Sequence, residues 1–169
     1  MREKCGPISG IRKEPRIEES QRQDMFEAET VALAVPVTER DHTMGPTDAR
    51  VTVVSYGYYQ CPGCKKTHQS TEKLARELLD KVRLVHRHFP LLKTHERAQR
   101  AAESAEAAAA QGKFWEMHRR LYLRPDKLSD RDLRQHAKEI KLDVERFDRE
   151  MASGIYSDQI LKRFYFSLW

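Results

Sequence analysis

The stretch YGYYQCPGC, residues 56–64, holds the residues with the clearest chemical character in the chain. Two cysteines separated by two residues can hold part of a metal site, form a structural disulfide, or act as a working dithiol. On a helix, Cys61 and Cys64 would lie on the same face and within disulfide reach. Their chemistry therefore depends on the element that carries them.

The cysteine pair follows a segment that has the composition of a buried strand. VTVVSY, residues 51–56, is rich in β-branched residues with almost no polar alternation, which predicts a strand buried on both faces of a parallel sheet. Functional residues of open α/β sheets lie at the carboxyl ends of such strands. Cys61 then falls at the start of the next helix, and Pro62 takes the first helical position.

A cysteine at a helix start is expected to be the reactive one. Unpaired backbone N–H groups and the positive end of the helix dipole favour a thiolate, so the pKa of Cys61 should be lowered. His68, one helical turn beyond Cys64, is the only histidine expected close enough to tune the pair. The other six are expected at surface or second-layer positions: His42, His86, His88, His95, His118 and His136.

Two other interpretations of the cysteines remain open. A metal-binding protein could use Cys61 and Cys64 with histidines such as His68, His86 and His88. However, the chain has no second Cys-x-x-Cys, and a proline inside the pair fits zinc-finger spacing poorly. Two inert buried cysteines are the other alternative. We expect a dithiol that needs neither a metal nor another cofactor.

The remaining elements are predicted from periodicity and turn signals. Residues 1–29 are charged and lack a helical or strand period, which indicates a mobile leader. Residues 31–37 could form an edge strand, and DHTMGPTDA, residues 41–49, has the composition of a loop. VRLVHRHF, residues 82–89, predicts a second strand and completes a βαβ unit. Helical patterns follow, in which Ser129 with Asp132 resembles a capping pair and Asp143 can cap a later helix. They include an alanine stripe typical of close helix packing: Ala98, Ala101, Ala102, Ala105, Ala108 and Ala109.

Composition limits the classes of protein that fit. The chain has 169 residues and a formal charge of +5, and its acidic and basic residues are mixed along the whole length. That pattern predicts a solvated surface and no nucleic-acid binding. Three cysteines are too few for a secreted disulfide framework, and no segment is apolar enough for a signal peptide or a membrane span. We expect a cytoplasmic protein that does not bind membranes.

The cysteine motif and its surroundings resemble the DsbA-type thiol-disulfide oxidoreductases, which have a thioredoxin fold. The resemblance covers about residues 37–165 and is carried by ERDHTMGPTDARVTVVSYGYYQCPGC, VRLVHRHFPLLKTHERAQRAAESAEAAAAQGKFWEMHRRLY and LDVERFDREM. It implies an α/β thioredoxin-like domain over residues 30–169, with a helical insertion at about 94–151. It also implies that Cys61 is the attacking thiol and Cys64 the resolving thiol. Pro62, Gly63 and His68 would tune the pair, and Gly63 stands where the family often has histidine or an aromatic residue.

The C-terminal region departs from that family. Its members place a cis-proline loop opposite the dithiol, followed by two antiparallel strands and a last helix. Here the last proline is Pro125, and GIYSDQILKRFYFSLW ends where that segment would begin, so we expect the C-terminal part of the sheet to be missing. The uncovered sheet edge and the aromatic tail then predict a homodimer or aggregation.

The leading hypothesis is a thiol-disulfide oxidoreductase that exchanges disulfides with protein or small thiol substrates. The alternative is a truncated thioredoxin-like binding module with weak catalysis.

Overall fold

The structure is a computed structural model that describes residues 35–78, 81–90 and 95–166. These residues belong to one compact unit that begins at residue 34. The predicted leader lies outside the described residues, as does most of the strand predicted over residues 31–37. Residues 35–37 are described, and they are not part of a strand.

A three-stranded sheet forms the centre of the described chain. Its strands are β1 (His42–Met44), β2 (Val51–Gly57) and β3 (Val82–His88), in the order β1-β3-β2. Strands β2 and β3 are parallel, and β1 runs antiparallel to β3. The predicted βαβ unit is therefore confirmed. The loop predicted over residues 41–49 is wrong at β1, because three strand residues before a Gly-Pro turn carry too little periodicity to be recognised.

The burial of the strands differs from the prediction. β3 is the middle strand and is almost completely buried, whereas in β2 the side chains of Val51 and Tyr56 are 46% and 41% exposed. The prediction that residues 51–56 are buried on both faces is therefore wrong. Within the described part of the chain β2 pairs only with β3, and a run of β-branched residues does not distinguish a central strand from an outer one.

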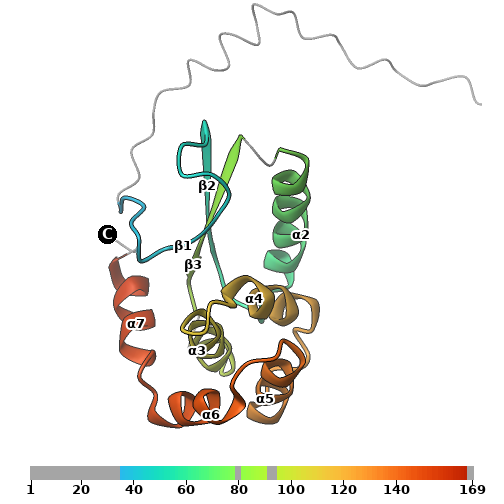
Figure 1. Cartoon of the computed structure of the whole chain (residues 1–169), viewed down its shortest axis with the longest axis vertical. Coiled ribbons are helices and arrows are strands. Elements are labelled where there is room, and N and C mark those ends of the chain that lie inside the picture. Colours follow the sequence, from blue (N-terminus) through green and yellow to red (C-terminus); the bar gives the residue numbers. More distant parts are fainter. Residues whose placement is uncertain (1–34, 79–80, 91–94, 167–169) are drawn as a thin grey trace, which may run out of the picture. The chain divides into compact units, whose positions relative to one another are not determined.

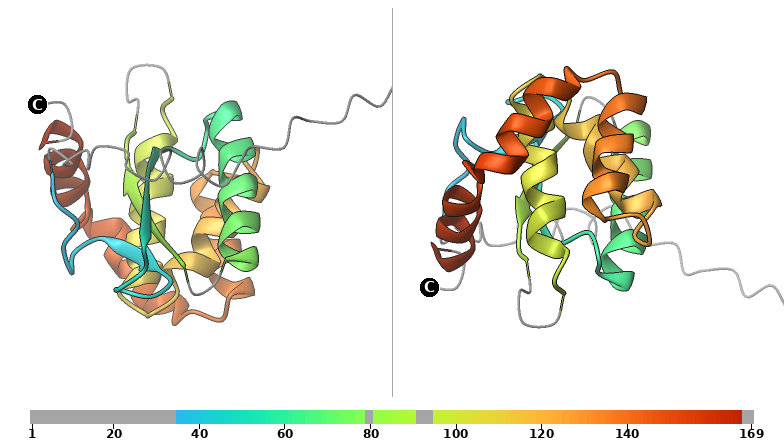
Figure 2. Two further views of the ribbon diagram at one scale, coloured as in Figure 1. Left: turned by 90° about the horizontal axis from the view of Figure 1, so that it is seen from above. Right: turned by 90° about the horizontal axis from the view of Figure 1, so that it is seen from below.

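Helices α2 (Pro62–Glu77) and α7 (Ser157–Phe166) lie on opposite sides of the sheet, as Figures 1 and 2 show. On the α2 side, Ala75 packs with Val82 and Leu84 of β3. α7 contacts β3 and the next helix of the chain, α3 (Ala98–Ala109). The sheet is thus covered on both faces by helices from different parts of the sequence.

α3 is the central helix of the helical part. It contacts α4 (Phe114–Leu123), α5 (Asp130–Glu139) and α6 (Val144–Ser153) as well as α7. The predicted alanine packing is confirmed, since the small side chains let neighbouring helices approach closely. Burial extends around the whole helix and includes two carboxylates, those of Glu103 and Glu106.

Local signals correctly placed the starts of two later helices. Ser129 and Asp132 form a reciprocal capping box at the start of α5. The Asp143 carboxylate accepts the backbone N–H of Arg146 and caps α6. These interactions lie within four residues of each other, so sequence alone can predict them.

The predicted aromatic tail surface is contradicted at one position. Ile160 lies on α7 and is only 1% exposed, because α7 packs against β3 and α3. Ile155, just before α7, is 55% exposed and fits the prediction. Tyr156 and Leu161 are half-buried. The backbone of α7 is described up to residue 166, but the other side chains of that predicted surface are not: Phe164, Phe166, Leu168 and Trp169.

A buried ion pair ties the segment before β1 to the middle strand. The Arg87 guanidinium donates two hydrogen bonds to the Asp41 carboxylate, at 2.8 and 3.0 Å. It also donates to the carbonyls of Val35 and Pro36 and to the Tyr56 hydroxyl. Both charged side chains are 6% exposed. A single arginine thus connects three segments on one face of the sheet.

Candidate functional site

The cysteine pair lies where the strand pattern predicts it, between β2 and α2. Cys61 is the N-cap of α2, and its Sγ accepts the backbone N–H of Cys64 at 3.0 Å. Pro62 occupies the first turn, where its missing N–H leaves no hydrogen bond unmade. Cys61 and Cys64 form a disulfide with Cα atoms 5.2 Å apart. Both residues are partly exposed, so a substrate sulfur can reach them.

The first turn of α2 favours negative charge on the Cys61 sulfur. It contains no acidic residue, and Lys65 follows the pair directly, with Nζ 3.5 Å from the Leu123 carbonyl. The helix dipole and the Cys64 N–H both stabilise a thiolate at the N-cap. Gly63 is exposed, and a Cβ at that position would meet only the Cys61 Sγ, at 4.0 Å. The predicted tuning position therefore lies beside the expected nucleophile.

Gly57, the last residue of β2, allows the strand end to approach the second cysteine closely. A Cβ at this position would lie 2.6 Å from the Tyr122 hydroxyl, 3.6 Å from His86 Cε1 and 3.7 Å from Cys64 Sγ. No larger residue fits there without displacing the buried Tyr122 ring. The absence of a side chain at residue 57 thus brings Cys64 next to an aromatic and imidazole cluster.

Three histidines share a small cavity with Cys64. The cavity has a volume of roughly 80 Å³, and its lining includes Cys64, His68, His86 and His118. His68 stacks on Tyr122, with ring centroids 4.7 Å apart and an interplanar angle of 20°. The rings of His86 and His118 meet edge to face at 4.4 Å. The inner side of the cysteine pair is therefore lined by imidazoles.

Burial keeps these imidazoles neutral. It lowers the pKa of His118 and of His86 well below the usual value, and the neighbouring histidines lower both further. Burial also lowers the pKa of His68, although Glu72 opposes the shift. Tyr59, whose hydroxyl lies 3.0 Å from His118 Nδ1, has its pKa raised by burial. Around neutral pH this region thus contains uncharged rings that accept or donate hydrogen bonds.

The structure corrects the predicted placement of the histidines. The expectation was a surface or a second-layer position, and the surface position is excluded for His86, His88, His118 and His136, which are at most 5% exposed. His68 does line the cavity with Cys64, but His86 and His118 line it too, so His68 is not the only one. The periodicity of the sequence indicates that these histidines point inward. His86 and His88 continue the inward alternation of Leu84 on β3, and His118 falls on the apolar stripe of α4.

The alternative metal site with both cysteines as ligands is not the convergent ligand group of the described residues. Cys61 and Cys64 are joined to each other, and the convergent metal-ligand group of the described residues consists of His42, His88 and Glu106, without cysteine. The cysteine pair is therefore placed for redox chemistry.

We expect the domain to lose stability on mild acidification. Unfolded histidine has a pKa of about 6.5, and the folded pKa of His118 and His68 lies lower, so the unfolded chain binds more protons below that pH. Stability is then present above about pH 6.5 and is lost as the pH falls, by roughly 1.4 kcal/mol per pH unit and histidine. Urea unfolding at pH 7.0 and 5.5 measures this loss.

The His118→Gln variant should lose less free energy of unfolding between these two pH values than the unaltered protein. His95→Gln serves as the control, since His95 is only half-buried, and it should show the full loss. An unchanged loss in His118→Gln would contradict the assignment.

The comparisons with known proteins agree with this geometry. Residues 37–165 match the family model described as Thioredoxin. A thioredoxin-like oxidoreductase from Silicibacter pomeroyi DSS-3 superimposes with a TM-score of 0.65 at 27% identity, over 78% of this chain and 72% of that one. Wolbachia pipientis alpha-DsbA1 gives a TM-score of 0.66 at 18% identity, over 78% and 69%, which supports the fold alone.

Curated relatives of the chain are named as antiporters and not as thioredoxins. The chain is 47% identical over 126 residues to the Na(+)/H(+) antiporter NhaA 3 of Salinispora tropica, and 39% identical over 134 residues to NhaA 1 of Mycobacterium sp. strain KMS. The matches cover 72% and 79% of this chain but 19% and 22% of the relatives, so the chain spans about a fifth of their length. None of the described helices combines the length and apolar composition of a membrane span. By the match over residues 37–165, the chain belongs to the thioredoxin family, and it shares the fold of the DsbA-type thiol-disulfide oxidoreductases.

Proposed function

We propose that this domain exchanges disulfides with protein or small-molecule substrates through Cys61 and Cys64. The observation that carries the proposal is the hydrogen bond from the Cys64 N–H to the Cys61 Sγ at the start of α2. This contact and the helix dipole stabilise the thiolate form of Cys61. Cys64 lies on the same helical turn and closer to the core, as expected of a thiol that reacts within the molecule.

Each half-reaction conserves electrons. In the reduced protein, the Cys61 thiolate attacks one sulfur of a substrate disulfide, and the other substrate sulfur leaves as a thiolate. Cys64, as a thiolate, then attacks the Cys61 sulfur, forms the intramolecular disulfide and releases the second substrate thiolate. The substrate gains two electrons and the protein loses two. The reverse sequence oxidises a substrate dithiol, so the same site serves either direction.

A partner-binding module with weak catalysis is the second candidate. It is favoured by the exposed side chains of β2, where Val51 and Tyr56 lie on an outer strand, and by the exposed Leu74 of α2. Such surfaces fit pairing with a second copy of the chain, as the sequence also predicts. Light scattering of the purified protein measures whether it is a monomer or a dimer.

Insulin reduction separates the two candidates. The reduced protein should accelerate insulin precipitation in dithiothreitol, and the variant with both Cys61→Ser and Cys64→Ser should not exceed the uncatalysed rate. A binding module without turnover would give the same rate as this double variant.

Location in the cytoplasm, and substrates that are neither nucleic acid nor membrane, remain predictions.

Alkylation measures the reactivity of Cys61 directly. In the reduced protein near pH 6.5, Cys61 should react with iodoacetamide faster than Cys64, since a thiol pKa below the ordinary value of about 8.5 leaves more thiolate at this pH. The matched control is the same protein unfolded in urea, where both rates should converge. Equal labelling of the two cysteines in the folded protein would contradict the assignment of Cys61 as nucleophile.

A further inference from the structure

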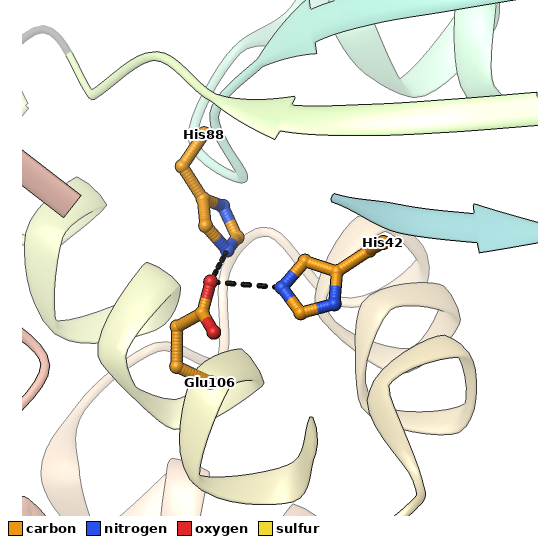
Figure 3. Close-up of side chains that lie close together, drawn as sticks. All are labelled: His42, His88 and Glu106. Carbon is orange, nitrogen blue, oxygen red and sulfur yellow. Dashed lines mark hydrogen bonds and ion pairs between the residues drawn. The ribbon is translucent and has the colours of Figure 1, made fainter. Parts of the chain in front are cut away.

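A second group of reactive side chains lies apart from the disulfide. His42 of β1, His88 of β3 and Glu106 of α3 converge on one point, as Figure 3 shows. The His42 Nε2 lies 2.9 Å from the Glu106 Oε1, and the His88 Nε2 lies 3.3 Å from the same oxygen. The thiol chemistry proposed above uses none of these three side chains.

The fold holds this group rigidly. Because β1 and β3 are antiparallel with His42 opposite His86, the side chains of His42 and His88 lie on the same face of the sheet. The His42 ring stacks on Phe114, with centroids 3.5 Å apart and an angle of 8°. Tyr59 meets the His88 ring edge to face at 5.9 Å. Aromatic rings thus fix the orientation of both imidazoles.

The charge of Glu106 requires compensation. Its side chain is 6% exposed, and an ionised carboxylate is costly to bury unless a positive charge lies against it. Either a proton shared with the imidazoles or a bound cation can supply the positive charge.

The donor atoms fit a transition-metal ion. A tetrahedral ion with bonds of roughly 2.0 to 2.1 Å holds neighbouring ligand atoms roughly 3.3 to 3.4 Å apart. The distance from His88 to Glu106, 3.3 Å, equals this value, the distance from His42 to Glu106, 2.9 Å, is shorter, and all three donor atoms lie within 4.8 Å of one another. Two histidines and one glutamate form a ligand set that zinc sites use, with a fourth position for water.

We propose that His42, His88 and Glu106 bind one divalent transition-metal ion, with Zn²⁺ as the best match to these ligands. The ion would join β1, β3 and α3, and so connect the sheet to the helical part of the domain. This proposal is independent of disulfide exchange, because neither cysteine is a ligand.

Metal binding to the oxidised protein tests the proposal. The sample carries Cys5→Ser and an intact disulfide between Cys61 and Cys64, so that no thiolate can bind metal, and a chelator removes resident ions. Calorimetric titration with Zn²⁺ should give one site per chain. Co²⁺ should give visible absorption of a tetrahedral site without a thiolate charge-transfer band. A hundredfold excess over the dissociation constant should raise the melting temperature by roughly 5 to 10 °C.

Variants locate the site. Glu106→Gln removes one ligand and should weaken Zn²⁺ binding about a hundredfold or more. The matched control is His136→Gln, which alters a buried histidine of α5 that contacts the Lys127 carbonyl, and it should bind Zn²⁺ like the parent. Circular dichroism verifies that both variants are folded. The proposal is overturned if the parent binds no Zn²⁺, or if a folded Glu106→Gln binds it equally well.

A measurement on the parent protein alone covers the case in which Glu106→Gln does not fold. Imidazole nitrogen signals in NMR spectra report which histidines bind a metal. Zn²⁺ should shift the Nε2 signals of His42 and His88 strongly and leave that of His136 in place. Shifts confined to other histidines would overturn the proposal.

Discussion

Cys64→Ser should accumulate stable mixed disulfides with its substrates, whereas Cys61→Ser should form none. After Cys61 attacks a substrate disulfide, Cys64 is the thiol of the described residues that lies close enough for an intramolecular exit, with its Cα 5.2 Å away. A serine hydroxyl is a very poor nucleophile toward a disulfide, so the adduct persists. We expect insulin-reducing activity to fall to the uncatalysed rate in Cys61→Ser. Non-reducing gels and mass spectrometry of the purified variants measure the adducts.

Cys5→Ser is the control for this experiment, because Cys5 takes no part in the proposed chemistry, and it should behave like the unaltered protein. Trapping by Cys61→Ser but not by Cys64→Ser would show that the roles of the two cysteines are reversed. Trapping by neither variant would argue for a binding module without exchange activity.

Asp41→Ala should reduce the free energy of unfolding by about 3 to 5 kcal/mol, the usual cost of leaving one member of a buried ion pair alone. Arg87 would then keep a guanidinium that is 6% exposed without its carboxylate partner. It would retain its bonds to the carbonyls of Val35 and Pro36, which hold the segment before β1. Urea unfolding at neutral pH measures the difference.

The matched control is Glu77→Ala, which removes an exposed partner of Lys73 on α2. The side chains of that pair are 77% and 60% exposed, so the loss should stay below about 1 kcal/mol. Similar losses in both variants would show that the Arg87 network contributes no more than a surface pair.

The sequence was sufficient to predict the part of the site that depends on neighbours along the chain. Pro62 in the first turn, Cys61 at the N-cap and the capping residues Ser129 and Asp143 all act within one helical turn. The β-branched residues of β2 and β3 are also a local signal, and they allowed both strands to be predicted. The short range of these interactions makes them visible in sequence.

Features that depend on contacts between distant segments of the sequence were not predicted. β1 has only three residues and exists because β3 offers a partner for it. The histidines were expected at surface or second-layer positions, although the alternation of β3 and the stripe of α4 place His86, His88 and His118 inward. Glu106 likewise lies within an alanine-rich helix that is buried on all sides. In each case the position relative to the core, and not the residue type, decided burial.

Because β3 lies in the middle of the domain, the elements that pack against it are synthesised at different times. The strand is paired by β1, made about forty residues earlier, and is contacted by α7, made about seventy residues later. On the ribosome, Cys61 and Cys64 therefore emerge long before the last helix that contacts β3. The nascent pair is first surrounded by water, and its neutral imidazole environment is complete only after β3 and α4, which carry His86 and His118, have been made and packed against α2. A chaperone or oxidant that meets the growing chain before α4 has packed would thus encounter the cysteine pair without its imidazole neighbours on β3 and α4.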